Sequence, residues 1–147
     1  MQALQPTLPF STQRFYCRKS FDEMIAAYTS CGGTVGADDL APLLEKHNKG
    51  NFFDLAKRLA SRDVFSFQWE DRFWVPMFQF NRNDMSVKQE VRRVVYELHT
   101  VLDNWTLAWW FTEPNAWLKN RRPVDMVDNQ FSEVLGAARA DRFVATG

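Results

Sequence analysis

Apolar side chains recur at helical spacing through most of this chain, and at a spacing of two over one short stretch. In the first half the helical spacing predicts helices over residues 20–31, 37–46 and 52–62. Ser20-Phe-Asp-Glu23 has the sequence of a capping box before the first helix, and Asn51 is a capping residue before the third. The side chains of the third helix that are predicted to point inward are Phe52, Leu55, Ala56 and Leu59.

The spacing of two follows directly after the third helix. Residues 64–69 alternate between apolar and polar side chains, the turn-forming residues 70–72 follow, and residues 73–80 are again rich in aromatic side chains. This pattern predicts a β-hairpin. Proline cannot donate a backbone hydrogen bond, so Pro76 is expected on an edge strand or at a bulge.

Helical spacing returns in the second half. Ser86-Val-Lys-Gln89 is a second capping-box sequence, and it predicts a helix from there to about Leu102. Pro114 ends the next helix near Thr112, and Pro123 suits the first position of a further helical turn. The second half is therefore expected to be a compact set of short helices.

The predicted fold is mainly α with one β-hairpin, in three parts. Residues 1–19 contain Pro6 and Pro9 and are expected to form an extended arm. Residues 20–80 have the element order of a winged helix-turn-helix, and residues 86–147 form a helical module.

The module contains an ordered set of short motifs. They are Trp105-Thr-Leu-Ala-Trp-Trp-Phe-Thr-Glu-Pro-Asn115, Ala-Trp-Leu118, Arg121-Arg-Pro-Val-Asp-Met-Val127 and Val134-Leu-Gly-Ala-Ala-Arg-Ala-Asp-Arg142. Over about residues 87–147 this order resembles the C-terminal toxin-binding domain of the Xre/MbcA/ParS antitoxins. The N-terminal half differs from the Xre-type half that is usual in that family.

The resemblance implies an antitoxin that binds a toxin of the RES class, which degrades NAD or transfers ADP-ribose, and that often represses its own operon. In that family the C-terminal segment enters the active-site cleft of the toxin. Arginines suit protein interfaces, and an apolar residue near the chain end would anchor such a segment. The candidate toxin-binding residues are Arg121, Arg122, Asp125, Arg139, Arg142, Phe143 and Gly147.

Structural roles are the alternative for these residues. The arginines can instead pair with Asp125, Asp128 or Asp141, and Phe143 can fold back on Leu135. Trp105, Trp109 and Trp110 are expected in the core of the module, because their spacing places them on one helix.

DNA binding would need a local basic patch, because the chain has 18 basic and 18 acidic residues and no net charge. Residues 46–62 contain five basic side chains and one acidic one. These side chains can meet phosphates, or they can simply be the solvated face of a helix. Glu70 and Asp71, at the tip of the hairpin, would repel phosphate. The candidate DNA-binding residues are Lys49, Asn51, Lys57, Arg58 and Arg62.

The remaining expectations are mostly negative. His47 and His99 lack metal-ligand spacing, and no catalytic motif is found, so neither an enzyme nor a metal or cofactor site is expected. Cys17 and Cys31 are expected to be reduced thiols in a cytoplasmic protein with no membrane span. The aromatic content of the second half suggests a homodimer. Two functions compete with an antitoxin: a winged-helix regulator without a toxin, and an adaptor that binds another protein.

Overall fold

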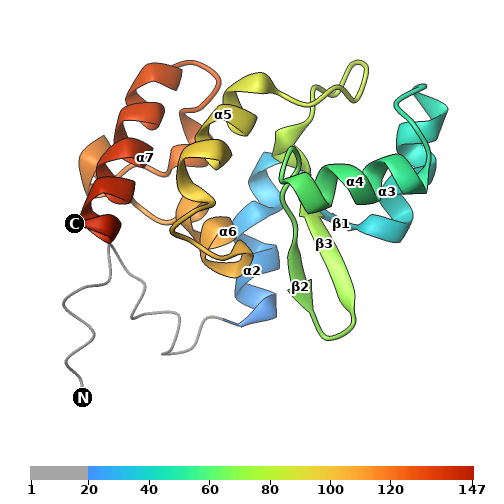
Figure 1. Cartoon of the computed structure of the whole chain (residues 1–147), viewed down its shortest axis with the longest axis horizontal. Helices are drawn as coiled ribbons and strands as arrows, with labels where there is room; N and C mark the ends of the chain where they lie inside the picture. The colour runs from blue at the N-terminus through green and yellow to red at the C-terminus, as the bar shows by residue number, and fades with distance from the viewer. Residues whose placement is uncertain (1–19) are drawn as a thin grey trace.

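The computed structural model describes residues 20–147; the predicted arm, residues 1–19, lies outside this range. The elements in chain order are α2 (Phe21–Tyr28), the 3-10 turn η2 (Thr29–Cys31), β1 (Thr34–Gly36), α3 (Ala37–Lys46), α4 (Phe52–Ser61), β2 (Phe67–Trp69), β3 (Arg72–Pro76), the 3-10 turn η3 (Met77–Gln79), α5 (Gln89–Leu98), α6 (Asn104–Thr112), the 3-10 turns η4 (Ala116–Leu118) and η5 (Pro123–Asp125), and α7 (Phe131–Thr146). The fold is therefore mainly helical with a small antiparallel sheet, as the sequence predicted (Figure 1).

The predicted helices of the first half are confirmed, together with two of their caps. Ser20 and Glu23 form a reciprocal capping box at the start of α2, with bonds of 3.1 and 2.9 Å. Asn51 and Asp54 form the same arrangement at the start of α4. These bonds satisfy backbone N–H groups that have no partner inside the helix, so the local sequence fixes both helix starts.

The sheet has three strands in the order β1-β3-β2, and all pairs are antiparallel. The predicted hairpin is confirmed, although its strands β2 and β3 are shorter than the alternating pattern. The sequence did not predict β1. Because β1 pairs with β3, the strand that ends at Pro76 is central, and the expectation of an edge strand or bulge was wrong. Pro76 is tolerated there because β2 pairs with β3 only as far as Trp74, so at Pro76 the strand has a partner on one side only.

Gln79 explains why the hairpin strands stop early. Its buried side-chain amide accepts a hydrogen bond from the backbone N–H of Phe65 and donates to the carbonyls of Phe65 and Pro76. These bonds, of 2.9 to 3.0 Å, take the place of backbone hydrogen bonds between the two hairpin segments at Phe65 and Pro76.

The predicted second capping box was wrong. α5 begins at Gln89, with Lys88 at its N-cap and no side-chain cap. Ser86 instead bonds to Asp84 and to the side chain of Asn81, in the loop that precedes the helix. The hydroxyl is therefore used inside that loop.

Helices α5 and α7 lie side by side in the C-terminal half, and α2 lies beside α6 (Figure 1). The larger hydrophobic cluster joins side chains of α2, the start of the hairpin and α5, α6 and α7. A second cluster lies among α3, α4, β3 and the loop before α5. The first helix thus packs with the C-terminal helices, and the hydroxyl of Tyr28 donates a hydrogen bond to the carbonyl of Ala108 in α6. None of the helices in the described part of the chain is both long and apolar enough to cross a membrane.

Candidate functional site

Arg122 and Asp125, in the third motif of the module, join the C-terminal half to α2. Arg122 donates two hydrogen bonds to the carboxylate of Asp125, of 2.8 and 2.9 Å. The same guanidinium group donates to the carbonyl of Ala27, at 3.1 Å, and lies 3.4 Å from the hydroxyl of Ser30. Two parallel hydrogen bonds between a guanidinium group and a carboxylate fix both the distance between the two side chains and their relative orientation. Arg122 and Asp125 therefore have the structural role that the sequence left open, and about a quarter of the Arg122 side chain is exposed.

The buried carboxylate of Asp141 on α7 is hydrogen-bonded to residues of the first two motifs of the module. Asp141 is 5% exposed and accepts hydrogen bonds from the indole N–H of Trp110 at 2.7 Å, from that of Trp117 at 2.9 Å and from the amide of Asn115 at 3.2 Å. The sequence suggested an arginine as a partner of Asp141, but these three donors take that place. They hold α6 and η4 against the last helix.

A second buried carboxylate joins α5 to α7. Glu97 is 5% exposed, and three arginines reach it: Arg93 at 2.9 Å, Arg142 at 3.0 Å and Arg139 at 3.4 Å. Burial opposes the ionisation of this carboxyl group. The hydrogen bonds from Arg93 and Arg139 and the charges of Arg142 and Arg139 outweigh burial, so the pKa of Glu97 lies below its ordinary value.

Arg139 and Arg142 of the candidate set are thus partly used within the chain, although each side chain is still about half exposed. Arg121 donates to the carbonyl of Leu118 and lies 3.9 Å from Glu133. Glu97 and Asp141 were not predicted as structural centres. Both are acidic residues at helical positions that otherwise hold buried apolar side chains, and that spacing was the available signal.

The end of the chain is part of the last helix. α7 continues to Thr146, whose hydroxyl donates to the carbonyl of Arg142, so the segment after Ala140 is helical. Phe143 is 74% exposed and does not fold back on Leu135. The last residue, Gly147, is exposed at the end of this helix.

An exposed strip runs along α7. Gly136, Ala140, Phe143 and Val144 follow one another at intervals of four, three and one residues, so they lie on one side of the helix and form what we call the α7 strip. Trp117, which is 58% exposed, borders the strip, because it lines a hollow together with Gly136.

The five candidate DNA-binding residues do not all share one face: Lys49, Arg58 and Arg62 line two adjoining hollows toward α5, and Lys57 lies outside them. Lys57 lies over the ring of Phe53, 4.9 Å from its centroid. Arg58 and Lys49 line a hollow toward α5, and Arg62 donates to the carbonyl of His99 at 3.0 Å. Asn51 is used as the helix cap described above.

Two side chains of α4 that were predicted to be inward are exposed. Phe52 is 54% exposed and Ala56 is also at the surface, because the hairpin does not cover this side of α4. They line a groove of about 380 Å³ between α4 and the hairpin, with Phe73 on the hairpin side.

Within residues 20–147 there is no group of three or more His, Cys, Asp or Glu side chains that could hold a metal ion. No protein-family model, no curated protein and no solved structure matches this chain.

Proposed function

We propose that this protein is an antitoxin-like binding protein whose α7 strip docks on a partner protein, a RES-class toxin by the resemblance of the module. The observation that carries the proposal is the exposure of the strip. Phe143 and Val144 are 74% and 48% exposed, and Trp117, which borders the strip at Gly136, is 58% exposed. Clustered exposed apolar side chains of this size are typical of protein interfaces.

Gly136 supports the same interpretation. A glycine inside a helix is less favourable than alanine by roughly 0.5–1 kcal/mol. A Cβ atom added at Gly136 would meet no atom of residues 20–147 within 4 Å, so packing within this part of the chain does not require glycine there. A helix surface without a side chain lets the backbone of a partner approach closely.

The edges of the strip indicate the charge of the partner. Arg139 and Arg142 are half exposed and share Glu97 with a third arginine, so this edge has more positive than negative charge. The proposed partner surface is therefore an apolar pocket with acidic side chains at its rim.

The test is neutralisation of a RES-class toxin encoded beside this gene, in cells that express both proteins, and titration of the purified pair. We expect Gly136→Leu and Phe143→Asp to abolish neutralisation at unchanged melting temperature. Phe53→Asp is the matched control, because Phe53 is 64% exposed on α4, outside the strip. Equal loss in the control, or no binding by the wild-type protein, contradicts the proposal.

Truncation gives a second test of the same site. Deleting residues 144–147 removes the last turn of α7, whose residues are largely exposed. We expect little change in melting temperature and weaker binding of the toxin. A large drop in melting temperature with unchanged binding would mean that the end of the chain only stabilises the fold.

DNA binding by a winged helix-turn-helix is the second proposal. It is supported by the order α2, β1, α3, α4, β2, β3 together with the pairing of β1 to β3, which is the arrangement of winged-helix domains. In that arrangement α4 would be the recognition helix. Changing Lys57, Arg58 and Arg62 together to alanine should abolish a gel shift with operator DNA, and binding that survives the change contradicts the assignment.

Homodimer formation stays a prediction, but the surface that would form the dimer is not the aromatic side chains from which it was predicted. The aromatic side chains of α6 are almost all buried in the single chain: Trp109 is 3% exposed, Trp110 1% and Phe111 0%. They are not available to a second copy. A dimer through the C-terminal half would therefore use the α7 strip and would compete with the toxin. Light scattering at micromolar concentration that shows only monomer contradicts it.

A further inference from the structure

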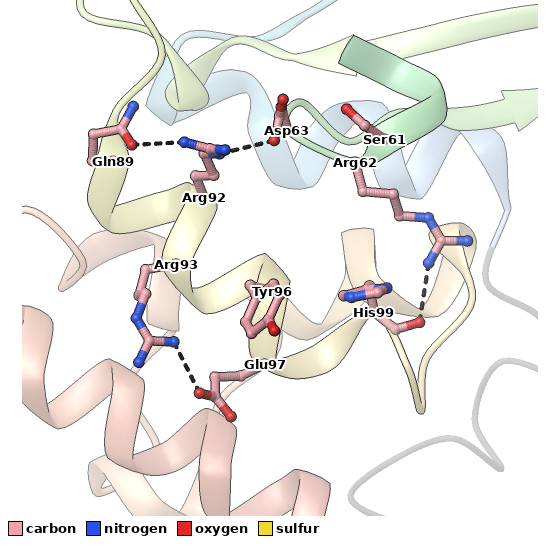
Figure 2. Close-up of a pocket in the computed structure, with 9 residues that line it drawn as sticks. All are labelled: Ser61, Arg62, Asp63, Gln89, Arg92, Arg93, Tyr96, Glu97 and His99. Atoms are coloured by element: carbon pink, nitrogen blue, oxygen red, sulfur yellow. Dashed lines mark hydrogen bonds and ion pairs between the residues drawn. The ribbon is translucent and has the colours of Figure 1, made fainter. Parts of the chain in front are cut away.

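A polar hollow of about 350 Å³ lies between the end of α4 and the outer face of α5 (Figure 2). Arg62 and Asp63 come from the segment after α4. Arg92, Arg93 and Tyr96 come from α5, and Figure 2 shows Tyr96 between the two arginines and His99. The volume is within the range of about 300–1,000 Å³ that is common for small-ligand sites.

The acidic side chains of the hollow are already compensated. Arg92 binds Asp63 at 2.8 Å, and Glu97 is covered by Arg93 and the two arginines of α7. An arginine has five N–H donors, and one or two hydrogen bonds are found for each of Arg62, Arg92 and Arg93 within the described residues. The three guanidinium groups therefore still have donors for an anion.

The positive charge continues beyond the hollow. A neighbouring hollow shares Asp63, Gln89 and Arg92 with the first one and adds Lys49 and Arg58. The two hollows together contain five basic side chains and two carboxylates, Asp63 and Glu97. In a chain without net charge this is a concentrated basic surface, and it suits phosphate groups.

Tyr96 gives this basic hollow an aromatic surface. Its side chain is 65% exposed on α5, and its ring centroid lies 5.8 Å from that of His99. Burial in the core does not explain a tyrosine at this position. An exposed aromatic ring beside basic side chains is the combination that binds a base together with its phosphate.

We propose that this hollow binds a nucleoside phosphate, either as a free nucleotide or as one unit of a single-stranded nucleic acid. The phosphate contacts the guanidinium groups of Arg92 and Arg93, which Figure 2 shows on one side of Tyr96. Arg62, beside His99 on the other side, adds to the positive charge of the hollow. The base stacks on Tyr96. This site is separate from the α7 strip, and it does not depend on binding of a toxin.

The experiment measures binding of four probes to the full chain: AMP, inorganic phosphate, a fluorescein-labelled oligothymidine strand, and the same strand annealed to its complement. The variants are Tyr96→Ala and Arg92→Gln. Phe53→Ala and Lys57→Gln are matched controls, because both side chains lie on α4 outside the hollow. Circular dichroism melting of each protein checks that it is folded.

We expect AMP or the single strand to bind. Tyr96→Ala should weaken that binding by at least about fivefold, because a stacked base contributes roughly that much or more. Arg92→Gln should weaken it by a similar factor, because it removes a charge-assisted hydrogen bond to the phosphate. Binding of AMP shows that a free nucleotide is enough, whereas binding of the single strand alone identifies nucleic acid as the source. The controls should bind as the wild-type protein does.

Four results would overturn the proposal. They are no binding of AMP or of the single strand, binding of the duplex alone, inorganic phosphate binding as tightly as AMP with no effect of Tyr96→Ala, and equal weakening by the control variants. The last result would place nucleic acid on α4 instead of the hollow.

Discussion

Replacing Asp141 by alanine should destabilise the C-terminal half more than any change at its surface. The carboxylate is the common acceptor of Trp110, Asn115 and Trp117, and it joins η4 and α6 to α7. Alanine removes the acceptor and leaves all three donors in place. The expected loss follows from how well each donor can then reach water.

Two of the three donors cannot reach water without opening the fold. Trp110 is 1% exposed and Asn115 is 5% exposed. A buried donor left without a partner costs about 1–3 kcal/mol. Trp117 is 58% exposed, so its N–H can bind solvent and adds little. The sum for these two donors is a loss of about 2–6 kcal/mol, a large part of the ~5–15 kcal/mol by which a domain of this size is stable.

Urea denaturation, followed by tryptophan fluorescence and by circular dichroism, measures this loss. Trp117→Phe removes only the exposed donor and should cost about 1 kcal/mol. Glu133→Ala is the matched control on the same helix, because the carboxylate of Glu133 is 56% exposed and lies 3.9 Å from Arg121. It should cost less than about 1 kcal/mol. The reasoning is refuted if Asp141→Ala loses no more stability than Glu133→Ala.

Three further predictions concern other polar contacts. The pKa of Glu97 in the folded protein lies below its ordinary value of 4.5, so the ionised carboxylate stabilises the fold at pH values above 4.5. This stabilisation is lost as the pH falls through the lower pKa of the folded state. Glu97→Gln should therefore be less stable at neutral pH and lack this acid-dependent loss in urea midpoints measured down to about pH 3; an unchanged pH profile would count against it. Burial raises the pKa of the Cys31 thiol although Arg122 opposes the rise, so in a Cys17→Ser background Ellman's reagent should react more slowly with folded than with unfolded protein. Equal rates would contradict this. Arg122→Lys loses the forked pair with Asp125 and should cost about 1–2 kcal/mol in urea denaturation, and a neutral result would show that the fork is not needed.

Local sequence was enough for most of the helices. Ser20 and Asn51 cap their helices with partners three residues away, so the whole signal lies within one turn. Ser86 shows the limit of such signals. Its capping-box sequence is intact, but its hydroxyl is hydrogen-bonded to Asp84, and the helix starts later.

Strand β1 shows a different limit. Its three residues have no alternating pattern long enough to be read, and they form a strand because they pair with β3 some forty residues later. The hairpin, in contrast, joins neighbouring segments, and its alternation was visible. Exposure of Phe52 likewise depended on where the hairpin lies relative to α4.

The sequence by itself determined the helical class, the caps of α2 and α4, the hairpin and the motif order of the last third of the chain, because each depends on residues that are close together along it. Only the tertiary structure decided what the motifs do. The donors to Asp141 lie 24 to 31 positions away, and Arg139 lies 42 positions from Glu97. Polar groups at such separations meet only when the helices pack, and burial then makes each of them need a partner. The same packing leaves Phe143 and Tyr96 exposed, and these are the side chains that our two proposed sites use.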